Sequence, residues 1–327
     1  MSILVQKFGG TSLRDINNQS KLLKHIRKSI EEGNDLVVVV SAMGRKGEPY
    51  ATDTLIQVME KICEDIDPKK KDLIMSCGEV ISTAIVSHLL DTEGIPSEPL
   101  MGFQAGILTD NNFNDSKILD IDIKRIKKYL EDGKVVVVAG FQGATIDMEI
   151  TTLGRGGSDT TAVALGGFLG ADRVDIFTDV PGVAMIDPRI VPYAKYIKNI
   201  SYNDMYNLSS SGATVIHPRA ALAGKHFNIP IRVLSTFLDG DYTLISNTES
   251  DGKIVGIAIE AQDEKSSVSI IYNKAYKEEI IKDMMGFIIE DEKNILKIIY
   301  SEEKISFIVK NDYVETFGQR LYDYFIN

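Results

Sequence analysis

The chain has little cysteine and a shortage of positive charge. Only Cys63 and Cys77 occur among its 327 residues. Two cysteines form neither a disulfide framework nor a metal-ligand cluster, which suits a reducing cytosol, and because both lie in apolar segments we expect them in the core. The 36 basic and 47 acidic residues give a net charge of −11. This balance argues against a general nucleic-acid or anionic-membrane surface.

Targeting and membrane signals are lacking as well. The first residues run directly into an apolar strand pattern, without the basic stretch and cleavage site of a signal peptide. We find no run of about 18 uninterrupted apolar residues, no long internal repeat and no low-complexity tract. With 44% hydrophobic and 25% charged residues, the composition is that of a soluble protein of one or two domains. We therefore expect a cytoplasmic protein, with neither nucleic acid nor membrane as partner.

The most informative stretch is residues 151–165, where three glycines and Arg155 lead into Ser158, Asp159 and an alanine-rich apolar segment. Such glycines let backbone N–H groups approach a ligand, Ser or Asp caps a helix, and a helix N-terminus favours an anion. The pattern predicts an anion-binding turn that carries its own cation and its own acid. Taken alone, it fits a tight structural connection equally well.

A second anion-binding turn is predicted near the N-terminus. A strand at 3–8 ends in two glycines, Thr11 and Ser12, and Lys7 at the strand's end would direct its ammonium towards this turn. The turn is not a Walker loop, because no glycine-lysine-Ser/Thr triplet follows the glycines. An ordinary surface lysine on a first strand is the alternative.

Alternating apolar strands and amphipathic helices over residues 1–246 predict a mainly parallel sheet with helices on both faces. The polar stretch 247–252 is the expected domain boundary, and short alternating strands beyond it predict a small α+β unit with an antiparallel sheet. Strands are expected at 3–8, 36–40, 95–100, 135–139, 174–177, 231–234, 242–245, 254–260, 267–272, 294–300 and 304–310. The main helices are expected at 20–32, from 55, from 68, at 116–131, after 158, and at 203–211, 218–226, 274–285 and 314–325.

The helix that opens at Asp67 and Pro68 poses a question about Glu79. Its apolar face is predicted to consist of Leu73, Ile74, Cys77, Val80, Ile81, Ala84, Ile85 and Leu89. Glu79 falls on the other side, in line with Ser76, Ser82 and Thr83. Spacing alone therefore favours a solvent-exposed carboxylate.

Five turns at predicted strand ends would meet at one edge of a parallel sheet: residues 7–12, 41–54, 140–143, 154–159 and 178–189. Glycine amides and two cations supply positive charge there, and Asp159, Asp179 and Asp187 can hold a lysine or a phosphate-bound metal. This arrangement suits phosphoryl transfer. A nucleotide-binding regulator that does no chemistry fits it too, and the residues alone leave the substrate open.

The ordered motifs closely resemble those of the aspartokinases, in the amino-acid kinase superfamily. They lie at residues 7–12, 41–44, 51–55, 76–79, 104–106, 138–143, 151–165, 177–180, 187–189 and 217–219. The loop at 45–53 is similar to that of the monofunctional bacterial enzymes of the lysine and diaminopimelate branch. The resemblance implies a three-layer αβα amino-acid kinase fold with a mainly parallel sheet over residues 1–246. A single small α+β ACT-like domain, regulatory or dimerising, would follow over 253–327.

The resemblance also implies an activity: ATP-dependent phosphorylation of the β-carboxylate of L-aspartate to 4-phospho-L-aspartate. This is the first step of lysine, threonine and methionine biosynthesis, and Mg²⁺ accompanies ATP. Lys7 would stabilise the transferring phosphoryl group, and Asp159 would organise that lysine. The implied substrate-binding residues are Ser41, Thr52, Glu79, Arg155, Gly156, Gly157 and Ser158. The implied ATP-binding residues are Lys7, Phe8, Gly9, Gly10, Thr178, Asp179, Ala184, Asp187 and Arg189, and no resident metal site is implied.

Within this resemblance Arg155 would hold an aspartate carboxylate, and Glu79 would bind the ammonium, which replaces the solvent-exposed interpretation. Two departures stand out. About 75 residues remain for the ACT region, enough for one module rather than two, and residues 272–276 replace the usual aspartate-proline-glycine turn. Feedback inhibition by lysine or threonine is therefore not carried over. In addition, Ala221 and Leu222 replace a commoner valine-glutamate pair.

Two alternatives stay open beside an aspartokinase. One is a superfamily relative that acts on another acid, such as glutamate or carbamate, against which Thr52, Glu79 and Arg155 argue. The other is a nucleotide-sensing or assembly subunit. Loss of Lys7 or Asp159 would favour this alternative, but the sequence contains both residues. Because ACT modules generally pair edge to edge, we expect a homodimer through the C-terminal domain.

Overall fold

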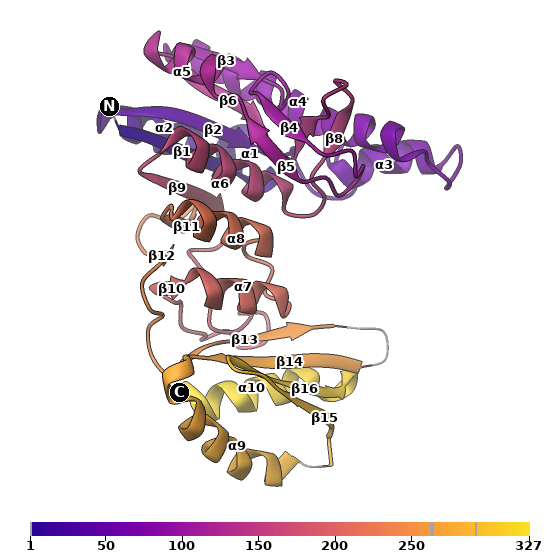
Figure 1. Ribbon diagram of the computed structural model, residues 1–327, viewed down its shortest axis with the longest axis vertical. Helices are drawn as coiled ribbons and strands as arrows, with labels where there is room; N and C mark the ends of the chain where they lie inside the picture. Colours follow the sequence, from indigo (N-terminus) through magenta and orange to yellow (C-terminus); the bar gives the residue numbers. More distant parts are fainter. Residues whose placement is uncertain (1, 262–264, 292) are drawn as a thin grey trace. The chain divides into compact units, whose positions relative to one another are not determined.

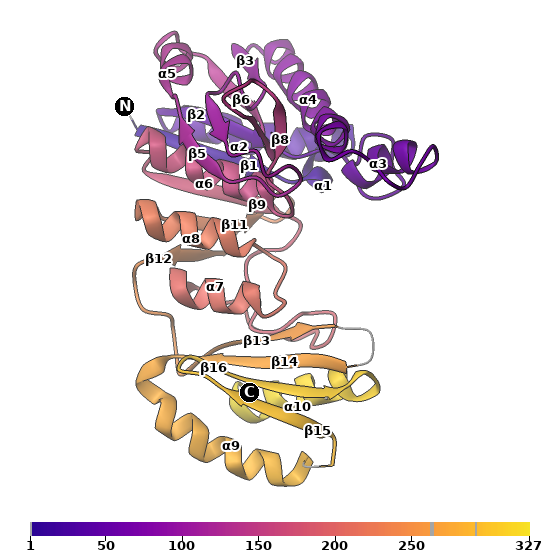
Figure 2. The same ribbon diagram turned by 45° about the vertical axis from the view of Figure 1, so that its right-hand side comes forward.

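The computed structural model describes residues 2–261, 265–291 and 293–327 (Figures 1 and 2). The chain divides into two compact units. The first comprises Met1–Pro181 and His226–Gly240, and the second comprises Gly182–Lys225 and Asp241–Asn327. Residues 182–225 thus group with the C-terminal part of the chain. The division into domains at 1–246 and 253–327 stays a prediction.

The centre of the first unit is a parallel sheet with the strand order β11-β9-β1-β2-β6-β3 (Figure 1). Its strands are β1 (Ser2–Phe8), β2 (Asn34–Val40), β3 (Ser97–Leu100), β6 (Val135–Ala139), β9 (Arg173–Thr178) and β11 (Ile231–Ser235). All of β6 and the last five residues of β2 are buried, as expected for strands with helices on both faces. The predicted parallel sheet is confirmed.

Strand alternation decides which side chains of β1 face which helices. Leu4 and Phe8 pack in one core cluster with Leu22 and Leu90, which lie on two of the helices. Lys7 lies on the other face of the strand, because successive side chains point to opposite sides. The helices of this unit are α1 (Gly10–Leu13), α2 (Ile16–Glu31), α3 (Thr52–Glu60), α4 (Pro68–Thr92), α5 (Lys124–Glu131) and α6 (Gly157–Leu169), and α6 contacts β1. Lys7 therefore faces the side that α6 covers.

A second sheet in the first unit was not predicted. It has the order β5-β4-β7-β8, with β4 (Ile107–Thr109), β5 (Ile118–Ile121), β7 (Gln142–Ala144) and β8 (Ile150–Thr152). The predicted helix at 116–131 is wrong in its first half, because Ile118 and Ile121 pair with β4. Such β-branched residues fit a strand better than a helix. Helix α5 begins only at Lys124, whose N–H is accepted by Asp122 at 3.2 Å.

The buried face of α4 also differs from the prediction. Leu73, expected in the core, is 57% exposed, whereas the buried positions are Asp72, Met75, Ser76, Gly78, Glu79, Ser82, Thr83, Val86, Ser87 and Leu90. Small hydroxyl side chains can be buried at little cost when they bond to their own helix. Ser82 and Thr83 donate to the carbonyls of Gly78 and Glu79 at 3.1 and 2.7 Å.

Two further properties of this region bear on the predictions. By length and composition alone α4 could cross a membrane, but half of its apolar window is buried inside the protein, as in the core helix of a globular fold. Cys63, expected in the core, is exposed, and Cys77 is half-buried. The prediction for Cys63 is wrong because Cys63 follows α3, none of whose residues is buried.

The second unit contains two groups of strands. β10 (Asn199–Ser201), which was not predicted, pairs in parallel with β12 (Tyr242–Ser246). The predicted antiparallel sheet is confirmed, in the order β13-β14-β16-β15, with β13 (Ile254–Glu260), β14 (Lys265–Tyr272), β15 (Ile295–Tyr300) and β16 (Lys304–Lys310). The helices are α7 (Tyr202–Ser210), α8 (Pro218–Phe227, which ends in the first unit), α9 (Lys277–Asp291) and α10 (Val314–Phe325), with 3₁₀ turns η1 (Lys274–Tyr276) and η2 (Asn311–Tyr313).

One apolar cluster explains why residues 182–225 belong to this unit. Ile186 and Val191 are buried in the same core as Phe307, Phe317 and Leu321 of the antiparallel sheet and α10. The pattern along the chain, which predicts the boundary at 247–252, does not register this packing.

Candidate active site

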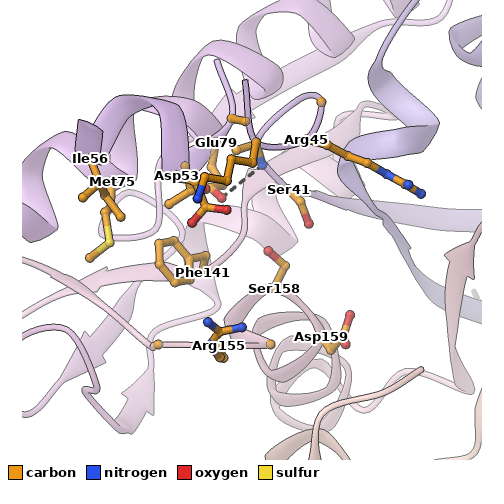
Figure 3. A pocket seen from close by; sticks show the side chains of 18 of the residues that line it. Ser41, Arg45, Asp53, Ile56, Met75, Glu79, Phe141, Arg155, Ser158 and Asp159 are labelled. Carbon is orange, nitrogen blue, oxygen red and sulfur yellow. Dashed lines mark hydrogen bonds between the residues drawn. The ribbon is translucent and has the colours of Figure 1, made fainter. Parts of the chain in front are cut away.

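A cavity of about 550 Å³ lies in the first unit, where the parallel strands end. Every residue predicted for catalysis or for substrate binding lines it (Figure 3). These residues are Lys7, Ser41, Thr52, Glu79, Arg155, Gly156, Gly157, Ser158 and Asp159. The sequence therefore located the residues of one real cavity, which several separate turns build together.

Lys7 and Asp159 form an ion pair at the cavity. Lys7 Nζ lies 2.7 Å from Asp159 Oδ1, and the two side chains are 13% and 11% exposed. Asp159 lies in the first turn of α6, where the helix dipole favours negative charge. The expected Ser or Asp N-cap is wrong, because α6 begins at Gly157, ahead of both residues. Gly156, in the left-handed conformation with φ 65°, is the N-cap.

The glycine turn after β1 is in close contact with the turn after β2. A Cβ atom on Gly10 would lie 2.4 Å from the carbonyl oxygen of Ala42, so no side chain fits there. The N–H of Gly44 donates to the carbonyl of Gly10 at 3.1 Å. A Cβ on Gly9 would lie 3.6 Å from Lys7 Nζ. The ammonium of Lys7 thus lies beside the glycine turn, as predicted.

Glu79 is a buried carboxyl group, and one of its oxygens has no hydrogen-bond partner among the described residues. Its side chain is 3% exposed, and Oε1 accepts the N–H of Ala42 at 3.0 Å (Figure 3). Among the residues that the structure describes, none hydrogen-bonds to Oε2. Burial raises the pKa of Glu79 to about 8. The solvent-exposed interpretation that spacing favoured is wrong, and Oε2 keeps an unused capacity to accept a hydrogen bond.

Arg155 supplies a positive charge at the cavity. It lies between Gly154 and Gly156, whose φ angles are +71° and +65°. Figure 3 shows Arg155 and Glu79 on opposite sides of the cavity, with Phe141 between their levels. Arg155 is exposed and lines the cavity, and within the described ranges it forms no ion pair with a carboxylate. A ligand with both an ammonium and a carboxylate would match these two groups.

The residues predicted for ATP, other than Lys7, lie outside the cavity lining. Phe8 is fully buried, and its ring stacks on Phe177 with centroids 4.5 Å apart. Thr178 ends β9, and next to it Asp179 Oδ2 lies 2.7 Å from Nη2 of the cavity residue Arg45. Gly9 and Gly10 form the turn into α1. The remaining predicted ATP residues, Ala184, Asp187 and Arg189, belong to the second unit.

Within that second unit Asp187 and Arg189 form a local ion pair, with Nη2 2.5 Å from Oδ2. The hydrogen bonds from Arg189 lower the pKa of Asp187. Ala184 forms an isolated antiparallel bridge with Tyr196. These contacts build an ordered turn, and the role of its residues in ATP binding stays a prediction.

Sequence reasoning missed several residues at the cavity. Arg45, Lys46, Asp53, Lys71 and Asn114 also line it. Arg45 and Lys46 lie next to each other between Gly44 and Gly47. Two basic residues between glycines indicate an anion-binding loop, and the prediction did not use this pattern. Lys71 and Asn114 gave no such signal, since a lysine in the first turns of a helix and an asparagine in a loop are ordinary surface residues.

The acids at the cavity do not form a metal site of their own. Across the described part of the chain, no group of three or more His, Cys, Asp or Glu side chains is arranged to hold a metal ion. The cavity instead combines cations, glycine amides and single carboxylates, which is the character of a site for a phosphate-bearing ligand.

Comparison with known proteins agrees with this fold. The model of the amino acid kinase family matches residues 2–235. Aspartokinase 1 of Bacillus subtilis is 46% identical over 250 residues, covering 76% of this chain and 62% of the relative. An aspartokinase of Geobacillus stearothermophilus is 40% identical over 281 residues, covering 86% and 68%. The chain thus spans about two thirds of the length of the curated relatives it matches.

A solved structure supports the fold independently. The crystal structure of E. coli aspartokinase III in complex with aspartate and ADP, in its R-state, matches with a TM-score of 0.84. The match covers 99% of this chain and 100% of that chain at 21% sequence identity. At this identity the likeness defines the fold, that of an amino-acid kinase with an ACT-like domain. The chain belongs to the amino acid kinase family and, within it, to the aspartokinases.

Proposed function

We propose that this protein is an ATP-dependent aspartate kinase, which transfers the γ-phosphoryl group of ATP to the β-carboxylate of L-aspartate. One observation carries the proposal: the Lys7–Asp159 ion pair lines the same cavity as Glu79, whose Oε2 accepts no hydrogen bond from the described residues, and the cation of Arg155. The product, 4-phospho-L-aspartate, would enter lysine, threonine and methionine biosynthesis. The names of the relatives, all aspartokinases, support this assignment.

Two groups of the cavity, the carboxyl of Glu79 and the guanidinium of Arg155, fit the two ends of an amino acid. The substrate ammonium would donate to Glu79 Oε2, which now accepts nothing from the described residues. Arg155 would bind the α-carboxylate, since a guanidinium matches carboxylate geometry. Hydroxyl groups of Ser41, Thr52 and Ser158 line the same cavity and would complete the hydrogen bonds. The complex of E. coli aspartokinase III with aspartate and ADP is consistent with such a site.

Phosphoryl transfer to a carboxylate needs charge neutralisation more than a base. The attacking oxygen is already anionic, so no proton has to be removed from it. Lys7 would stabilise the charge on the transferring phosphoryl group, and Asp159 would hold the lysine in place. The amides of Gly9 and Gly10 would bind phosphate oxygens, and Thr178, Asp179 and the 184–189 turn would contact the nucleotide. Mg²⁺ would enter as part of the ATP substrate, coordinated by phosphate and carboxylate oxygens.

Two other functions remain as competitors. A kinase for carbamate would leave the buried carboxylate of Glu79 without an ammonium partner, and a longer acid such as glutamate differs from aspartate by one methylene. A regulator without activity would have no use for a largely shielded lysine-aspartate ion pair at the anion-binding turn. ADP release measured with L-aspartate, L-glutamate and carbamate as acceptors tests the proposal. Turnover with aspartate alone supports it, and preference for another acceptor overturns it.

We further propose a cytoplasmic homodimer that pairs through the C-terminal ACT-like domain. β15 is, with β13, one of the two edge strands of the antiparallel sheet. Its side chains Leu296, Ile299 and Tyr300 are 46%, 44% and 52% exposed, and Ile289 of α9 is 76% exposed. Apolar side chains on an open sheet edge favour pairing with another strand. The partners of the proposed enzyme are L-aspartate, ATP and a second copy of the chain.

A further inference from the structure

Asp72 is a fully buried carboxylate in the first half of α4. It accepts four hydrogen bonds. The N–H of Asn114 donates to its two oxygens at 3.1 and 3.0 Å. The N–H of Thr152 donates at 2.9 Å, and the hydroxyl of Thr152 at 2.5 Å. Burial still raises the pKa of Asp72, so this carboxylate is costly to bury, and all the donors come from outside its helix.

The two segments that Asp72 holds are joined to each other. The N–H and the hydroxyl of Ser116 both donate to the carbonyl of Thr152, at 3.0 and 2.8 Å. A Cβ on Gly154 would lie 2.7 Å from Asp115 Oδ1, so the loop also packs closely on the glycine before Arg155. Asn114, which lines the cavity, takes the left-handed conformation with φ 70°. Asp72 thus fixes the backbone that leads directly to Arg155.

The same helix carries Glu79. Asp72 and Glu79 are seven residues apart, so they lie on the same buried face of α4, about two turns from each other. One rigid helix therefore connects the carboxylate proposed to bind the substrate ammonium with the segment that carries the guanidinium proposed to bind its carboxylate. The position of Arg155 relative to Glu79 depends on the hydrogen bonds of Asp72.

We infer that Asp72 is a positioning residue that sets the spacing between Glu79 and Arg155 and thereby the selectivity for aspartate. The inference rests on the proposed function. A hydrogen-bonded support outside the contacting residues keeps the substrate in the geometry where its reacting oxygen meets the phosphoryl group. When the support is weakened, aspartate binding loses strength, whereas the ATP residues at the ends of β1 and β9 keep their places.

The test uses Asp72→Asn, which retains the volume of the side chain but turns one acceptor into an N–H₂ group facing N–H donors. We expect the KM for aspartate to rise roughly tenfold and the KM for ATP to stay within about twofold. The ratio of kcat/KM for glutamate to that for aspartate should increase. Thr152→Val, which removes one of the four hydrogen bonds, should shift the aspartate KM in the same direction by less. Thr152→Ser, which keeps the hydroxyl, should have the wild-type KM for aspartate.

Asp67→Asn is the matched control. Asp67 caps the same helix by accepting the N–H groups of Lys69 and Lys70, and asparagine caps equally well, so all three parameters should stay at their wild-type values. A merely structural role for Asp72 predicts a lower kcat with unchanged KM values, and that result overturns the inference. If Asp72→Asn does not fold, an unchanged aspartate KM in folded Thr152→Val overturns it instead. A wild-type protein without aspartate turnover would contradict the proposed function itself.

Discussion

Lys7 Nζ lies 2.7 Å from Asp159 Oδ1, which joins the end of β1 to the first turn of α6. Alternation along β1 directs the lysine to the face that α6 covers, and the left-handed Gly156 begins the helix where Asp159 can meet it. Both side chains are largely shielded from solvent. The pair thus places a positive charge, held by a fixed partner, beside an anion-binding turn.

Removing either member of this pair should lower turnover without unfolding the protein. We expect Lys7→Ala to reduce kcat by roughly 10³-fold or more, and Asp159→Asn by about 10²-fold, because charge stabilisation of the phosphoryl group is the main catalytic term. Steady-state kinetics with circular dichroism as a folding check measures this. Lys24→Ala, which removes an exposed lysine paired with Asp239, is the control. Full activity in Asp159→Asn would contradict the role given to that residue.

Binding of aspartate should depend on pH through Glu79. Burial raises the pKa of this carboxyl to about 8, so in the free protein it is mainly protonated at neutral pH and must ionise to pair with an ammonium. The KM for aspartate should therefore fall as pH rises from about 6.5 to 8 and then level off. In Glu79→Gln the KM should be higher and this pH dependence lost. A wild-type KM that does not change over this range would exclude the proposed pairing.

The same group should make the ligand-free protein less stable at higher pH. Between the ordinary glutamate value of about 4.3 and the folded value of about 8, the folded state holds a proton that the unfolded state has released. Stability from this group is therefore present at low pH and is lost as pH rises through 8. The difference in Tm between Glu79→Gln and wild type should therefore shift by a few degrees in favour of the variant from pH 5 to pH 8.5. Thermal unfolding of both proteins at pH 5 and pH 8.5 measures this shift. The same Tm difference at both pH values would contradict the prediction.

The ion pair between Arg45 and Asp179 links the loop after β2 to the end of β9. Both side chains are exposed, at 66% and 44%, so the pair should contribute less than about 1 kcal/mol to stability. If Asp179 contacts the nucleotide, Asp179→Asn should raise the KM for ATP several-fold while the KM for aspartate and the Tm stay unchanged. A shift in the aspartate KM instead would mean that Asp179 acts only by holding Arg45.

The exposed edge strand β15 leads to a prediction about oligomeric state. We expect a dimer by light scattering at micromolar concentration. Ile299→Asp should yield monomers, because a buried unpaired charge is costly at an apolar interface. Ile62→Asp is the control, because it makes the same substitution at an exposed isoleucine of the first unit, whose side chain is 85% exposed. It should leave the dimer intact. A monomeric wild-type protein would rule out pairing through this edge.

The sequence predicted much of the cavity lining because most of the lining segments are short, glycine-rich turns that follow strands. Parallel strands bring such turns together whatever the details of packing, and this predicts that Lys7, Arg155 and Asp159 share one edge of the sheet. Glu79 lies in α4, and only the family resemblance assigns it to the site. The exposure of α4 could not be predicted in the same way. Periodicity treats serine and threonine as surface residues, whereas Ser82 and Thr83 are buried with their hydroxyls bonded to their own helix.

Contacts between distant segments account for the other differences. β5 forms a strand because Ile118 and Ile121 find partners on β4, and the local pattern does not distinguish this pairing from a helix. Asp72 was overlooked for the same reason. Its four hydrogen bonds come from Asn114 and Thr152, which lie 42 and 80 positions further along the chain. Long-range polar contacts of this kind leave no periodic trace in a sequence.

The most direct test of the account is hydroxamate formation from purified protein with ATP, Mg²⁺, L-aspartate and hydroxylamine, beside Lys7→Ala. Hydroxylamine traps the acyl phosphate, so the product identifies the carboxylate as the acceptor. The account predicts hydroxamate with aspartate, little or none with glutamate, and none in the Lys7→Ala variant. No hydroxamate from folded wild-type protein that still binds ATP would contradict it.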